Sequence, residues 1–285
     1  MLDRDESALQ ELQLSMQGHG LLDDERLVVA DIRDEQRVLE VFAKFRPDVV
    51  FHAAALKHLS LLEMHPSEGV KTNVWGTQVM LTASRSFGVR TFVNISTDKA
   101  ADPSSVLGAT KHVGEQLTAH AAADAGGTYL SVRFGNVIGT RGSALPLFRS
   151  QIADGGPVTI TDPEATRFFM TVAEACELVV QAGAIGHSGE VMVLDMGKPV
   201  SIAGLAERLI GESGRRIEVR YTGLRHGEKL HEVLFGESEL AVRRPHPLIA
   251  GVPVRPVSPE DALRRLEELG VELDPGVWSV GRVGA

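Results

Sequence analysis

The chain has 285 residues, 43% of them hydrophobic, and a formal net charge of −9. This size suits one large α/β domain, or one domain with a smaller lobe, and the apolar content allows a sizeable core. The negative charge argues against a nucleic-acid partner and does not favour binding to an anionic membrane. No run of about 18 apolar residues occurs, so we predict no membrane segment in this chain.

Cys176 is the single cysteine. It allows neither a disulfide framework nor a zinc site, so we expect a reducing compartment, the cytoplasm. Its apolar, helix-like surroundings predict a buried small hydrophobe. No His, Asp or Glu cluster has the spacing of metal ligands, and we predict no metal.

The first two-thirds of the chain alternates short apolar runs with segments of helix length. The expected strands are 27–30, 49–52, 91–96 and 129–134, and the expected helices are 6–17, 35–45, about 67–87 and about 105–123. Continuous apolar strands separated by helices are typical of a parallel sheet covered on both faces. The alternation predicts an α/β fold with a Rossmann-like, doubly wound parallel sheet.

The pattern changes after about Gly135. We expect helices at 145–153, 172–183 and 202–210, and strands at 158–161, 191–194 and 216–221. Ser258 would cap a last helix, with Pro259 at its first position. We therefore expect a dinucleotide-binding core in residues 1–134, joined by a return segment within 184–200. Residues 135–285 would form mainly a smaller, C-terminal substrate-binding lobe.

Residues at the carboxyl ends of the expected strands fit a dinucleotide site, because a doubly wound sheet binds its ligands there. Asp3 is placed to bind the adenosine ribose, and Asp31 could meet the adenine amino group. Small residues after the next strand would let a cofactor approach the backbone closely. The full set of candidate cofactor contacts is Asp3, Arg4, Asp31, Ile32, Ala53, Ala54, Ala55, Lys57, Asn73 and Lys111.

Asp3 would repel a 2′-phosphate, and this favours NAD as the cofactor. The adjacent Arg4 could accommodate that phosphate, so NADP stays an alternative. No G-x-G-x-x-G motif lies near the N-terminus. If Asp3 binds the ribose, that loop and the first strand are expected about 20 residues earlier, before Met1. The chain as given would then bind the cofactor poorly and expose apolar surface beside a missing strand. The alternative is that Asp3 is a surface residue and no dinucleotide binds.

Two neighbouring motifs, Ser96-Thr97-Asp98-Lys99-Ala100 and Gly108-Ala109-Thr110-Lys111, resemble those of one family. The chain is similar to the UDP-N-acetylglucosamine 4,6-dehydratases, in the polysaccharide-biosynthesis branch of the extended short-chain dehydrogenase/reductases. The likeness covers almost the whole chain. It includes FHAAALKH (51–58), TNVWGT (72–77), VRFGNVIGTRGS (132–143), TDPEATRFFM (161–170), LDMGKPV (194–200) and TGLRHGEKLHE (222–232).

The resemblance implies a specific reaction on a UDP-sugar. Members oxidise the sugar at C4 with a bound nicotinamide cofactor, lose water across C5 and C6, and return the hydride to C6. The product is a 4-keto-6-deoxy sugar nucleotide for surface polysaccharide or glycan synthesis. By analogy we also expect a homo-oligomer, and membrane association could come from a region before Met1.

The catalytic set that the resemblance implies is Thr97, Asp98, Lys99 and Lys111. Asp98 would protonate the departing hydroxyl, Lys99 would remove the C5 proton, and Thr97 would hydrogen-bond near the C4 oxygen. Burial and mutual influence can tune an adjacent acid and amine for this work. The alternative is an ordinary salt-bridging turn at the surface.

Lys111 would hold the nicotinamide ribose. Leu107, one helical turn earlier, stands where most of the superfamily has a tyrosine. Leucine has no proton to exchange, so Asp98 or Lys99 must act at the C4 hydroxyl, or the enzyme is impaired.

The candidate substrate contacts are Lys57, His58, Asn136, Arg141, Arg167, Arg225 and Glu228. Arginine can grip diphosphate oxygens bidentately, and a glutamate can accept from ribose hydroxyls. Three alternatives stay open: an epimerase of the same family, a non-catalytic nucleotide-binding protein, and a truncated product without activity.

Overall fold

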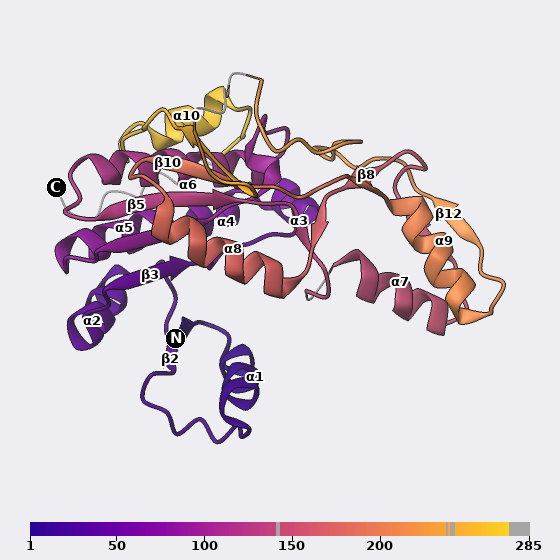
Figure 1. Cartoon of the computed structure of the whole chain (residues 1–285), viewed down its shortest axis with the longest axis horizontal. Helices are drawn as coiled ribbons and strands as arrows, with labels where there is room; N and C mark the ends of the chain where they lie inside the picture. Colours follow the sequence, from indigo (N-terminus) through magenta and orange to yellow (C-terminus); the bar gives the residue numbers. More distant parts are fainter. Residues whose placement is uncertain (141–142, 238, 240–242, 274–285) are drawn as a thin grey trace.

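The computed structural model describes residues 1–140, 143–237, 239 and 243–273. Its main feature is a six-stranded sheet in the order β13-β14-β10-β5-β4-β3 (Figure 1). Four strands run parallel: β3 (Val49–His52), β4 (Thr91–Ile95), β5 (Thr128–Arg133) and β10 (Glu190–Leu194). Two antiparallel strands extend this sheet, β14 (Ile249–Pro253) and β13 (Arg243–His246). The predicted Rossmann-like α/β sheet is confirmed.

Helices cover both faces of the sheet because neighbouring strand residues point to opposite sides. On β4, Phe92 enters one apolar cluster and Val93 enters the other. The first cluster is completed by α2 (Glu35–Phe45), α5 (Thr77–Ser86), α6 (Val106–Ala123) and α10 (Ala262–Glu268). The second is completed by α8 (Val172–Ile185).

The helix expected at about 67–87 is three consecutive helical segments. They are α4 (Pro66–Gly69), the π-helical η1 (Val70–Gly76) and α5, with α3 (Leu59–Met64) just before them. Gly88 follows α5 with a φ of 71°. That left-handed conformation suits glycine and ends the helix, as the sequence predicted.

A smaller lobe lies at the far end of the molecule (Figure 1). Its apolar core lies between α7 (Ala144–Ala153), α9 (Ile202–Ser213) and the parallel pair β7 (Val158–Ile160) and β12 (Val219–Tyr221). Two short pairs lie between the lobe and the sheet. They are β6 (Asn136–Val137) with β9 (Phe169–Met170), and β8 (Thr166–Arg167) with β11 (Val200–Ser201).

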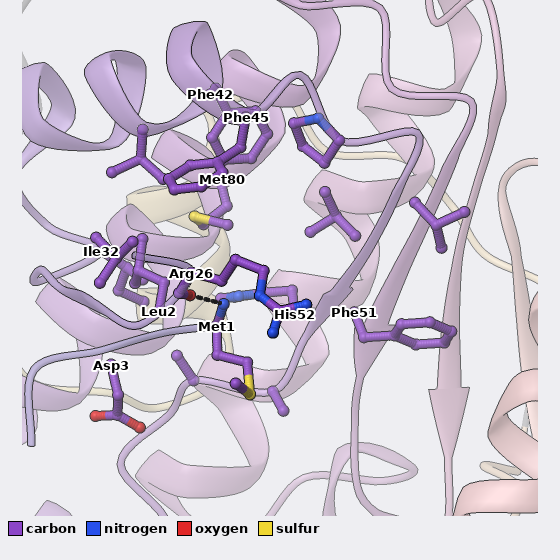
Figure 2. A pocket seen from close by; sticks show the side chains of 17 residues that line it. Met1, Leu2, Asp3, Arg26, Ile32, Phe42, Phe45, Phe51, His52 and Met80 are labelled. Carbon is purple, nitrogen blue, oxygen red and sulfur yellow. Dashed lines mark hydrogen bonds between the residues drawn. The ribbon is translucent and has the colours of Figure 1, made fainter. Parts of the chain in front are cut away.

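The first two strands form a sheet of their own. β1 (Leu2–Asp3) pairs in parallel with β2 (Val28–Val29), and α1 (Glu6–Gln17) lies beside them, apart from the six-stranded sheet (Figure 1). A cavity of about 520 Å³, lined by residues of both sheets, lies between this unit and β3 (Figure 2). Val49 and Phe51 on β3 are 46% and 49% exposed. The β1–β2 pair and the six-stranded sheet are thus separate, and apolar surface of β3 is exposed between them.

β1 and β3 point the same way on the two sides of this gap. Asp3 and Ala53, at their carboxyl ends, line one cavity. Met1 and Pro47, at their amino ends, line the gap itself. The carboxyl ends of the two sheets therefore still meet at one edge, despite the interruption.

Two local expectations are wrong. Cys176 is exposed, because it lies one position off the stripe of α8 that Ala175 and Val179 bury. The last helix begins after Asp261 rather than Ser258, since the Ser258 hydroxyl accepts a hydrogen bond from the Asp261 amide within a preceding turn. Among the described residues, no helix combines the length and the apolar character needed to span a bilayer.

Candidate active site

The predicted adenosine-end residues come together at the carboxyl ends of β1, β2 and β3. A cavity of about 180 Å³ is lined by Asp3, Arg4, Asp31, Ile32, Ala53, Ala54 and Ala55. The alanines present backbone and methyl groups, so a flat ring could approach closely. The sequence predicted each of these residues from its position after a strand.

Asp31 is already paired within this cavity. Arg33 grips both of its oxygens, with contacts of 3.0 and 2.6 Å, and these hydrogen bonds hold the pKa of the Asp31 carboxyl below its usual range. Arg4 lies 3.7 Å from the same carboxylate. Sequence reasoning missed Arg33, although it stands only two residues after Asp31.

Asn73 acts on the backbone beside the cavity. It lies in η1, is 1% exposed, and its amide both accepts from the Leu56 amide at 2.8 Å and donates to the Leu56 carbonyl at 3.0 Å. Its Nδ2 also reaches the Thr110 hydroxyl on α6. Asn73 thus fixes the backbone that follows Ala55.

A central cavity of about 410 Å³ lies where β4 ends and α6 begins. Among the residues that line it are Lys57, His58, Thr97, Lys99, Leu107, Lys111 and Asn136. Burial lowers the pKa of Lys111 to about 8, although Glu115 opposes that shift. Leu107 faces the same cavity as Lys111, as their one-turn spacing predicted.

The lysine cluster, as we call Asp98, Lys99 and Glu232, borders this cavity. The Lys99 ammonium lies 3.0 Å from Asp98 Oδ1 and 3.3 Å from Glu232 Oε1. The carboxylate side chains are 0% and 2% exposed, whereas that of Lys99 is 19% exposed. The Thr97 hydroxyl donates to Asp98 Oδ1 at 3.0 Å. Asp98 is therefore buried, and Thr97 and Lys99 connect it to the cavity.

An outer cavity of about 460 Å³ continues from the central one and shares Lys99, His58 and Asn136 with it. Arg225 and Glu228 line it, together with apolar residues of the smaller lobe. Lys99 therefore faces the region where the two cavities meet.

Arg167 also lines the outer cavity, but its guanidinium is largely occupied. It donates to Glu228 Oε1 at 3.0 Å and to the carbonyls of Thr166 and Leu230. Arg225 is exposed and donates to the Ser60 hydroxyl at 3.1 Å. Arg225 is thus the more available cation for a ligand. The predicted contact Arg141 lies outside the described residues.

A second buried charge cluster connects α6 with the end of β5. We call Glu115, Arg133 and Glu239 the arginine cluster. Arg133 is fully buried, 2.7 Å from Glu115 and 2.5 Å from Glu239. Burial alone lowers the pKa of Arg133, but the two carboxylates outweigh it and raise that pKa above its usual range.

No group of three His, Cys, Asp or Glu side chains in the described part of the chain could hold a metal ion. The site offers instead small residues and a buried lysine for a dinucleotide, a paired acid and amine, and an outer cavity with an available arginine. The sequence missed Ser60 and Glu232 in this arrangement. Glu232 falls within the quoted TGLRHGEKLHE motif, but nothing local marks it as a partner of Lys99.

The fold and these connected cavities define a Rossmann-like α/β protein of the extended short-chain dehydrogenase/reductase type. The chain belongs to the family of polysaccharide biosynthesis proteins, whose family model matches residues 1–253. It is 49% identical over 217 residues to the capsular polysaccharide biosynthesis protein CapD of Staphylococcus aureus. That match covers 75% of this chain but only 36% of CapD.

Solved structures give the same fold. Pen from Bacillus thuringiensis superposes with a TM-score of 0.80 at 34% identity, covering 90% of this chain and 81% of Pen. The UDP-glucose 4-epimerase of Thermus thermophilus, solved with NAD, has a TM-score of 0.67 at 22% identity. It covers 81% of this chain and 87% of the epimerase. This last likeness concerns the fold alone.

Proposed function

We propose that the chain carries the catalytic site of a nucleotide-sugar 4,6-dehydratase that acts on UDP-N-acetylglucosamine with NAD. The main observation is that Lys99, paired with Asp98, faces the junction of the central and outer cavities. Leu107 lines the central cavity where a 4-epimerase of this superfamily relies on a tyrosine. This arrangement favours elimination over simple epimerisation.

The described residues fit the two ends of NAD. Ala53, Ala54 and Ala55 leave room at the adenosine end, and Lys111 faces the central cavity at the nicotinamide end. The NAD in the structure of the Thermus thermophilus epimerase supports this choice. When bound, NAD would supply the hydride acceptor for sugar C4 and the hydride donor for C6, while Asp98 would take the C4 hydroxyl proton and Lys99 would return a proton to C5. The cavity between β1 and β3 separates the short sheet that carries Asp3 from the main sheet that carries Ala53, so we expect weak NAD binding.

Lys99 and Asp98 can share the proton transfers of elimination. When the proton between them lies on Asp98, the Lys99 amine is free to take the proton from sugar C5, which a neighbouring C4 ketone makes acidic. The C6 hydroxyl then leaves as water once it receives a proton. The Thr97 hydroxyl, bonded to buried Asp98 and lining the cavity, offers the route for that proton.

Arg225 and Glu228 are proposed to hold the nucleotide part of the substrate in the outer cavity. Arg225 is exposed and donates to the Ser60 hydroxyl, and its guanidinium could turn to a diphosphate. Arg167 keeps Glu228 in place through a 3.0 Å contact, so its role is to organise the cavity. Lys57, His58 and Asn136 would face the sugar in the central cavity.

Proton NMR of the reaction products tests the proposal. The chain is incubated with UDP-N-acetylglucosamine and a large excess of NAD, and Lys99→Ala serves as the matched control. A new C6 methyl doublet, absent with the control, supports the dehydratase. A product that keeps its C6 hydroxymethyl group and inverts C4 would instead identify an epimerase.

The gap between β1 and β3 favours one second candidate, a protein that binds the sugar nucleotide without turning it over. It predicts calorimetric binding of UDP that is lost in Arg225→Ala, with no detectable NAD binding. Adding a strand and glycine-rich loop from a relative before Met1 distinguishes the two. Under the dehydratase proposal this extended form binds NAD and makes the methyl product.

A further inference from the structure

Glu232 comes to Lys99 from a distant part of the chain. It ends the segment 222–232, which also carries Arg225 and Glu228. That segment is fastened near its end, because the Thr166 amide donates to the Leu230 carbonyl at 3.1 Å and the Lys229 ammonium donates to the Asp102 carbonyl. Glu232 is thus fixed in the same segment that lines the outer cavity.

Lys99 stands between two buried carboxylates and is the member of the lysine cluster that lines both cavities. A lysine side chain is a flexible four-carbon stem that ends in a point charge, so one contact leaves its head free to swing. Asp98 is its immediate chain neighbour and cannot alone fix the direction of the stem. The second contact, from Glu232, restricts it.

We propose that Glu232 is a positioning residue, which holds the Lys99 ammonium against Asp98 at the junction of the two cavities. The proposal rests on the proposed function, since Lys99 is the base of that reaction. Glu232 does not line either cavity among the residues described there, so it acts through Lys99 rather than on the sugar.

The free oxygens of the cluster argue against a purely structural ion pair. Asp98 Oδ2 and Glu232 Oε2 are both buried, and neither has a hydrogen-bond partner among the described residues. A buried acceptor without a partner destabilises the folded state, and a purely structural network usually avoids it. The arginine cluster, with the same two-carboxylate composition, leaves no such oxygen.

The charges around Lys99 determine the direction in which its pKa should change when Glu232 is replaced. Burial lowers the pKa of Lys99, but the Asp98 and Glu232 carboxylates outweigh it and leave that pKa above its usual range, against an opposing effect of Arg167. Removing one carboxylate while keeping the burial must therefore lower the pKa of Lys99. An opposite charge at this range shifts a pKa by about 1–3 units.

The experiment is a pH titration of ¹³Cε-labelled lysines by NMR in Glu232→Gln, which keeps the size and polarity of the side chain. The Lys99 signal is assigned by its loss in Lys99→Arg. Glu239→Gln, which removes a carboxylate of the arginine cluster, is the matched control, and exposed Lys198 is the internal reference.

We expect the pKa of Lys99 to fall by about 1–3 units in Glu232→Gln and to stay unchanged in Glu239→Gln. Glu232→Asp, with a shorter side chain that keeps its charge, should restore part of the shift. Thermal unfolding and circular dichroism verify that each variant is folded. A Lys99 pKa that is unchanged in folded Glu232→Gln would overturn the proposal.

Kinetics separate this inference from the function on which it rests. In Glu232→Gln the pH limb of kcat that reports the base should move to lower pH, the plateau of kcat above that limb should fall roughly tenfold or more, and KM should change little. If wild type makes no methyl product but the Lys99 titration shifts, the positioning holds and the dehydratase proposal fails. If wild type makes that product and the titration does not shift, the positioning role fails alone.

Discussion

The arginine cluster and the lysine cluster each place one cation between two carboxylates, yet their hydrogen bonding differs. In the arginine cluster every carboxylate oxygen accepts a hydrogen bond, including those from the Ser96 hydroxyl and the Gly236 amide. In the lysine cluster two buried oxygens accept no hydrogen bond from any residue that the structure describes, and Lys99 borders two cavities. A cluster whose hydrogen bonds are all made serves the fold, whereas the lysine cluster leaves Lys99 facing two cavities, where it can act on a ligand.

The largest effect is expected from a substitution that disrupts the lysine cluster. Lys99→Ala should lower kcat by more than about 10³-fold, because general acid–base groups contribute about 10²–10⁴-fold and here one lysine serves as the base. Steady-state kinetics measure the loss, using the form that carries an added strand and glycine-rich loop before Met1. Circular dichroism verifies that the variant is folded. An unchanged rate would remove Lys99 from the mechanism.

The next largest effect is expected from a substitution that disrupts the arginine cluster. Arg133→Met should destabilise the protein by about 3–4 kcal/mol, since it leaves two buried carboxylates without their cation. Urea denaturation measures the loss, and kcat per folded molecule should stay within about twofold. If Arg133→Met instead loses activity and keeps its stability, the arginine cluster is not purely structural, and the contrast between the two clusters is wrong.

Lys111 sharpens the comparison, because it is a buried lysine whose pKa moves the other way, down to about 8 from 10.5. Between pH 8 and pH 10.5 the folded protein binds fewer protons than the unfolded chain. The free energy of unfolding should therefore rise with pH across that range. The rise is on the order of 2–3 kcal/mol. Denaturation at pH 7.5 and pH 10.5 should show it, and Lys111→Met should abolish it. An equal rise in Lys111→Met would assign it to other groups.

The smallest effect concerns a cation outside both clusters. Arg225→Ala should raise KM for the sugar nucleotide about tenfold and lower kcat less, because one charge-assisted contact to the diphosphate is lost. Ser60→Ala is the matched control, since it removes only the hydrogen bond that Arg225 makes in this structure. A drop in kcat at constant KM would contradict a binding role.

The sequence predicted the parts of the fold that depend on local pattern. The strands that precede Asp31 and Ala53 follow from short apolar runs, and the carboxyl-end rule placed these two residues in one cavity. Leu107 and Lys111 share a cavity because helix periodicity puts them on one face.

Features that depend on tertiary approach could not be predicted. Glu232 reaches Lys99 across 133 positions, and only the path of the 222–232 segment brings them together. Asn73 reads from its position as a cofactor contact, but in the structure its side chain binds the Leu56 backbone. Cys176 looked buried because its neighbours are apolar, yet a shift of one residue on α8 faces it outward.

The most direct test of the lysine cluster as a dehydrating centre follows a deuterium label from sugar C4. UDP-N-acetylglucosamine deuterated at C4 is incubated with NAD and the form that carries an added strand and glycine-rich loop before Met1. The product is examined by NMR. We predict that the deuterium appears in a C6 methyl group beside a C4 ketone. Deuterium that stays at C4 of an inverted sugar, with the C6 hydroxyl intact, would contradict the account.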